Sequence, residues 1–127
     1  MAVFVFSTGS ILKQYNVDAQ IHISVNNRTT SKQKGRIIIW DTSSIDGPKV
    51  ALFEKKFKIE GNHTKVVSYT IPEYFNVDRY EVEIRLSNPH MAPYIQQKYT
   101  SQLQGAEFKE ALYAGELFHD STENENV

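Results

Sequence analysis

The 127-residue sequence contains no cysteine and no large excess of either charge. The absence of cysteine excludes disulfides, thiolate zinc sites and cysteine nucleophiles, and it fits folding in a reducing compartment. Fourteen basic and fifteen acidic side chains give a net charge of −1. Because proteins that grip nucleic acid through its phosphates usually carry a basic excess, we predict no nucleic-acid partner.

Long apolar runs are also lacking at the start of the chain. Val3, Phe4, Val5 and Phe6 are followed directly by Ser7. This run is too short for the apolar core of a signal peptide and far too short to span a membrane. We therefore expect a protein that is made in the cytoplasm without a signal peptide and that has no membrane span.

The polar residues do not form a pattern that predicts catalysis. The histidines are dispersed without the spacing of metal ligands: His22, His63, His90 and His119. Asp41, Asp46 and Asp78 lie in or beside turn-forming segments, where short carboxylates cap the backbone. We predict a protein that is not an enzyme and that uses no metal and no cofactor.

What the sequence does contain is β-branched and aromatic residues in alternation with polar ones. In residues 80–86 every second residue is apolar: Tyr80, Val82, Ile84 and Leu86. Residues 17–25 and 65–71 alternate in the same way, and residues 94–99 predict a further strand. Such alternation predicts strands with one buried and one exposed face.

Residues 36–40 would be apolar on both faces of a strand. Ile37 and Ile39 share one face. Ile38 and Trp40 share the other face. A strand of this kind is normally covered on both sides, so we predict that the face with Ile38 and Trp40 lies against something other than the second sheet.

Two segments depart from simple alternation. Residues 50–59 change parity partway, which predicts a β-bulge near Glu54 and Lys55. Residues 106–118 fit the start of a helix or a closing strand, and we favour a strand.

Together these segments predict an all-β fold, an antiparallel two-sheet sandwich of the Ig-like or jelly-roll-like kind with about 7–8 strands. The length fits one domain that needs no disulfide or metal. We expect residues 1–10 to be an N-terminal arm or strand, residues 11–119 to be the sandwich domain, and residues 120–127 to be a flexible acidic tail.

The N-terminal run suggests a function. Val3, Phe4, Val5 and Phe6 are uncharged, free of proline and strongly β-prone, so they are an aggregation hazard if unpaired. They either form a strand in their own sheet or add a strand to the sheet edge of a neighbouring subunit. In the second case, head-to-tail strand complementation generates rings or filaments.

A family resemblance supports the assembly hypothesis. Residues 35–42, which include the Trp40–Asp41 pair, together with residues 50–53, 71–72 and 80–89, resemble β-sandwich proteins of the Bacillus spore surface. Those relatives are the exosporium protein C-like group and the related endospore-appendage subunits. The ending, residues 113–118, is similar to their closing strand.

The resemblance implies a structural subunit that self-associates on a spore surface, the exosporium. It also accounts for the missing signal peptide, because spore layers are laid down inside the mother cell. Appendage subunits of this kind are often cross-linked through cysteines, and this chain has none, so any fibre linkage would be non-covalent.

We therefore predict a non-catalytic structural subunit that self-assembles, on a spore or another surface layer or fibre, through Val3, Phe4, Val5 and Phe6 and through the face with Ile38 and Trp40. Its partners would be copies of itself or other surface-layer subunits. The alternative is a carbohydrate- or peptide-binding module that uses Trp40 and exposed tyrosines as a stacking platform.

Overall fold

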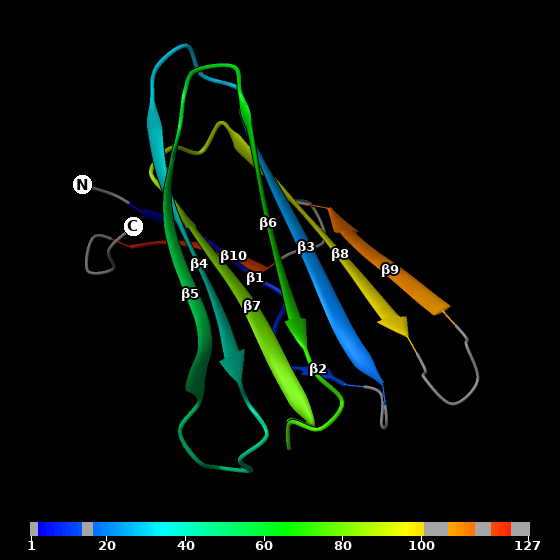
Figure 1. Ribbon diagram of the computed structural model, residues 1–127. Helices are drawn as coiled ribbons and strands as arrows, with labels where there is room; N and C mark the ends of the chain where they lie inside the picture. The colour runs from blue at the N-terminus through cyan, green and yellow to red at the C-terminus, as the bar shows by residue number, and fades with distance from the viewer. Residues whose placement is uncertain (1–2, 14–16, 101–106, 114–117, 123–127) are drawn as a thin grey trace.

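A computed structural model describes residues 3–13, 17–100, 107–113 and 118–122 (Figure 1). Within these ranges the chain forms ten β-strands and no helix, arranged in two antiparallel sheets. The predicted all-β two-sheet sandwich is confirmed. The strand count exceeds the predicted 7–8 because the N-terminal segment contributes two strands and the C-terminal segment contributes two more.

The two sheets are built from strands that are distant in sequence. Sheet A has the order β10-β1-β7-β4-β5, with β2 paired beside β1 along the same edge of β7. Its strands are β1 (Val3–Ser7), β2 (Ile11–Leu12), β4 (Gln33–Asp41), β5 (Val50–Ile59), β7 (Arg79–Leu86) and β10 (Phe118–Thr122). Sheet B has the order β6-β3-β8-β9. Its strands are β3 (Asp18–Asn27), β6 (Thr64–Ile71), β8 (Met91–Thr100) and β9 (Glu107–Tyr113).

The core lies between the sheets and follows the alternation of the sequence. The four apolar residues of β7 are fully buried: Tyr80, Val82, Ile84 and Leu86. Ile21, Ile23 and Val25 of β3 join the same cluster from the opposite sheet. Each such side chain contributes about 1.5–3 kcal/mol when it is buried, so these two strands supply much of the stability of the sandwich.

One polar cluster interrupts this core. Gln97 of β8 is fully buried, and its Oε1 accepts hydrogen bonds from the hydroxyls of Tyr80 (2.7 Å) and Tyr99 (3.1 Å). The Gln97 Nε2 atom has no hydrogen-bond partner among the described residues. The three side chains therefore link the two sheets through polar atoms inside an otherwise apolar layer.

Two predictions about the strands need correction. The irregularity in β5 lies not near Glu54 and Lys55 but at Leu52, which has no partner because Trp40 pairs with Ala51 and Ile39 pairs with Phe53. This single extra residue changes the parity, so both Leu52 and Phe53 pack against the core.

The second correction concerns the C-terminal region. The favoured closing strand in residues 106–118 becomes two strands, since β9 ends at Tyr113 and β10 begins at Phe118. The tail predicted for residues 120–127 is wrong for residues 120–122, which belong to β10 and pair with β1. Residues 114–117 and 123–127 lie outside the described residues.

A buried asparagine organises the loops at the upper end of the sandwich in Figure 1. Asn27, at the end of β3, is fully buried. Its Nδ2 lies 2.9–3.1 Å from the carbonyl oxygens of Ser31, Ile59 and Glu60. Its Oδ1 accepts the backbone N–H of Thr29 at 3.0 Å. One side chain therefore joins the β3–β4 loop to the β5–β6 loop.

Replacing this side chain should cost far more stability than replacing its neighbour. We expect Asn27→Ala to lower the free energy of unfolding by about 2–4 kcal/mol, because it leaves several buried polar groups without a hydrogen-bond partner. Asn26→Ala is the matched control, since Asn26 is exposed and has a single long contact to Thr64; it should cost about 0.5 kcal/mol or less. Urea unfolding measures both, and equal losses would contradict the role of Asn27.

Candidate binding surfaces

The N-terminal strand is paired on both edges within the molecule. One edge of β1 pairs with β7 and the other with β10. Phe4 lies opposite Leu86 and Phe6 opposite Ile84, so both phenylalanines point to the core side of sheet A. Of the two alternatives for this run, the structure has the strand in its own sheet, and no edge of it is left free for a neighbouring subunit.

The second predicted surface, with Ile38 and Trp40, is on the outer face of sheet A. Ile38 lies opposite Glu83, and Trp40 lies opposite Glu81. Ile38 is nevertheless buried, and it does not belong to the core cluster between the sheets. The strand is therefore covered on both sides, as its sequence predicts, and Ile38 presents almost no surface to a partner.

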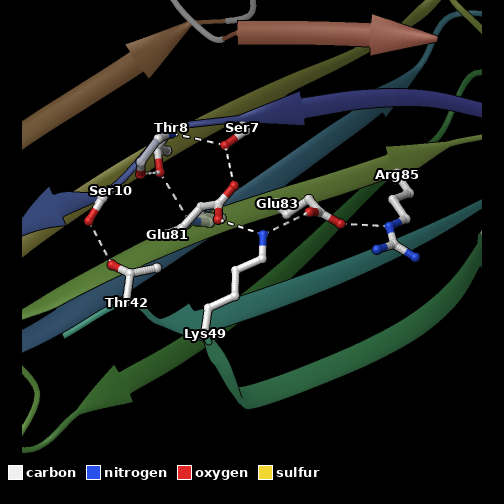
Figure 2. Close-up of polar contacts among 10 residues, drawn as sticks. Ser7, Thr8, Ser10, Thr42, Lys49, Glu81, Glu83 and Arg85 are labelled. Carbon is white, nitrogen blue, oxygen red and sulfur yellow. Dashed lines mark hydrogen bonds and ion pairs between the residues drawn. The ribbon is translucent and has the colours of Figure 1, made fainter. Parts of the chain in front are cut away.

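A chain of charged and hydroxyl groups lies on this outer face (Figure 2). The Lys49 Nζ is 3.0 Å from Glu81 Oε1 and 3.8 Å from Glu83 Oε1. Arg85 donates from Nε to Glu83 Oε2 at 2.6 Å, and Ser7 Oγ donates to Glu81 Oε2 at 2.5 Å. The network therefore joins β1, β7 and the β4–β5 loop across the face of the sheet.

Trp40 lies beneath this network. The Lys49 ammonium is 4.6 Å from the centroid of the indole ring, a cation–π distance that stabilises both groups by about 0.5–2 kcal/mol. One face of the indole is thus already occupied by a side chain that is also held by Glu81. A sugar ring could stack on that face only after displacing Lys49.

The least covered apolar side chains gather at the lower end of the sandwich in Figure 1, where β2 and the β4–β5 and β6–β7 connections meet. Leu12, Ile45 and Tyr74 are 70%, 80% and 79% exposed. Tyr74 packs edge-on against Phe75, with ring centroids 5.3 Å apart. These side chains line a cleft of about 680 Å³, which we call the end cleft.

A buried lysine lies at the base of the end cleft. Lys13 donates from Nζ to the carbonyl oxygen of Val17 at 2.7 Å, and its backbone N–H bonds to Asp78 O at 2.7 Å. Burial lowers the pKa of Lys13 below its ordinary value, while the nearby carboxylates of Asp18, Glu73 and Asp78 oppose that shift. The end cleft therefore combines an aromatic rim, acidic groups and one desolvated cation.

This arrangement is suited to binding. In the described parts of the chain, His, Asp and Glu side chains do not form a group of three that could hold a metal ion. A cleft of several hundred cubic ångströms with aromatic walls and a few convergent polar groups is typical of a ligand or partner site. Its aromatic residues, Tyr74 and Phe75, were missed in the sequence analysis, although two adjacent aromatics in a turn-forming segment are a usable signal.

One solved structure shares this fold. No family model and no curated protein matches the sequence. A solved structure described as the crystal structure of Thermotoga maritima 1070 matches 86% of this chain and 90% of that chain, with a TM-score of 0.57 and 8% identity. At that identity the likeness shows the fold alone. Across the described ranges, the structure has no helix that is long and apolar enough to cross a membrane.

Removing Lys49 should uncover Trp40. Because Trp40 is the only tryptophan, its fluorescence reports on this site alone. We expect Lys49→Ala to raise the acrylamide quenching constant and to lower the free energy of unfolding by about 1 kcal/mol or less. Lys56→Ala on β5 is the control and should leave quenching unchanged. If Lys49→Ala also leaves quenching unchanged, Lys49 does not cover the ring.

Proposed function

We propose that this chain is a non-catalytic β-sandwich subunit that self-assembles, and that it does so through the end cleft rather than through its N-terminal strand. The observation that carries the proposal is the exposure of Leu12, Ile45 and Tyr74 at one end of the molecule. Large apolar side chains clustered on a soluble domain mark an interaction surface. By contrast, β1 is paired on both edges and Ile38 is buried.

The assembly would build a surface layer or fibre, and a spore surface is the location that the sequence resemblance implies. Support for the structural role is a cleft that offers apolar contact area. Non-covalent packing would hold such a fibre together, since the sequence has no cysteine.

Association should depend on the rim of the end cleft. Sedimentation velocity over rising protein concentration should show an increasing mass for the unmodified chain, and Ile45→Ser/Tyr74→Ser should weaken association by about tenfold or more, because burial of these side chains is lost. Val66→Ser is the control, since Val66 is 63% exposed on β6, away from the cleft. If the unmodified chain sediments as a monomer even at high concentration, the proposal is wrong.

A second candidate function is favoured by the same cleft. Tyr74 and Phe75 offer aromatic faces beside polar groups, a combination that also suits a carbohydrate or an extended peptide. Screening on a glycan array should then give saturable binding that Tyr74→Ala abolishes and Trp40→Ala retains, because Lys49 already occupies the indole face. Absence of saturable binding would remove the carbohydrate reading.

A further inference from the structure

Five cationic side chains gather on the outer face of sheet A, where β4 begins and β5 ends, at the upper end of both strands in Figure 1. Lys34 lies opposite Lys58 in one row, and Arg36 lies between Lys56 and Arg85 in the next row. These residues face away from the core because they alternate along their strands with buried residues. We call the two rows the cationic face.

Three of the five cations have no partner of opposite charge. Lys34, Lys56 and Lys58 are exposed, and no carboxylate in the described parts of the chain forms an ion pair with any of them. Like charges directly opposite one another destabilise a sheet, so the pairing of Lys34 with Lys58 weakens the fold. An anion bound between the two ammonium groups would remove that repulsion.

The two arginines of the cationic face do have carboxylate partners, but these partners do not balance the charge. Arg36 forms an ion pair with Glu54. Glu83 is shared between two cations, Arg85 and Lys49. The Arg36 Nε–H has no acceptor among the described residues. Although the chain as a whole has a net charge of −1, the cationic face therefore keeps an excess of positive charge.

The layout of the cationic face suits an extended anion better than a small one. Side chains within a row start about 5 Å apart, and the two rows are about 7 Å apart along the strands, because a strand rises about 3.3 Å per residue. The cations thus spread over the surface of a sheet and do not converge in a pocket. A single sulfate or phosphate ion contacts only some of these cations, whereas a chain with a charge every few ångströms contacts them all.

The surroundings of the cationic face narrow the class of polyanion. Binding of single-stranded nucleic acid depends on aromatic side chains on which bases stack. Among the outward side chains of β4, β5 and β7 only Trp40 is aromatic, and Lys49 lies over its ring. An acidic peptide would add to the edge of a sheet rather than lie across its face. None of the large exposed apolar side chains of the described residues belongs to the two rows, so the face has no apolar anchor for a lipid surface.

From the charge and the layout we infer that the cationic face binds a linear polyanion without bases, a polysaccharide that carries sulfate or phosphate groups. Lysine binds such groups as a point charge, and a flat array of lysines accommodates them in more than one register. The inference goes beyond self-assembly and does not depend on it. The cationic face and the end cleft lie at opposite ends of the sandwich in Figure 1, so a ligand on one leaves the other open.

Heparin, a sulfated polysaccharide, serves as the probe. Isothermal titration calorimetry at low ionic strength should show saturable binding to the unmodified chain. We expect Lys56→Gln/Lys58→Gln to weaken this binding by about tenfold or more and to make it less dependent on salt, because fewer counterions are then released. Lys55→Gln/Lys65→Gln is the matched control. It also removes two lysines, but the register places both on the core-facing side of their strands, and its affinity should equal that of the unmodified chain.

The other outcomes overturn the inference. Absence of saturable heparin binding does so, and so does an equal loss in both lysine pairs, because net charge rather than the cationic face would then set the affinity. Oligo-dT, polyglutamate and phosphatidylserine vesicles are titrated at the same concentration of charge. Tighter binding of any of them than of heparin would make the partner a nucleic acid, an acidic polypeptide or a membrane surface instead. A monomeric mass in sedimentation would contradict self-assembly and leave this inference unchanged.

Discussion

The pairing of β7 on both of its edges is the constraint on which most of this structure depends. One edge holds β1 and β2 in line, and the other holds β4. The inward side chains of β7 are fully buried, while its outward side chains Glu81, Glu83 and Arg85 form the ionic network with Lys49. The same eight residues thus position the core, the N-terminal strand and the cover over Trp40.

The sequence predicts the strands of the sandwich well wherever a strand has one buried face. Residues 80–86 show this most clearly, because every inward position there is apolar. The sequence does not predict which strands become neighbours, because strand pairing depends on contacts between segments that are distant along the chain. For this reason Val3 to Phe6 could be assigned either to its own sheet or to that of another subunit. The position of the β5 bulge was predicted wrongly. A change of parity in the apolar pattern shows that the strand has one extra residue, but it does not show which residue is extra.

The candidate surfaces could be predicted only in part. Ile38 and Trp40 were placed on the outer face correctly, yet the sequence does not show that Lys49, which follows them in a loop, lies over the Trp40 ring. The end cleft joins residue 12, residue 45 and residues 74–75, and no local pattern brings segments so far apart together. No local pattern marks Asn27 either, because its hydrogen-bond partners in space come from two different loops.

The position of β1 also has a consequence for the time course of synthesis. Phe4 pairs with Leu86 and with Ser121, so the apolar N-terminal strand leaves the ribosome long before either partner exists. At about 5–20 residues per second, the delay is several seconds. Throughout that interval an uncharged β-prone segment has no sheet to join. The aggregation hazard read from Val3 to Phe6 therefore belongs to the nascent chain, and a chaperone that shields this segment would matter more to yield than to the finished fold.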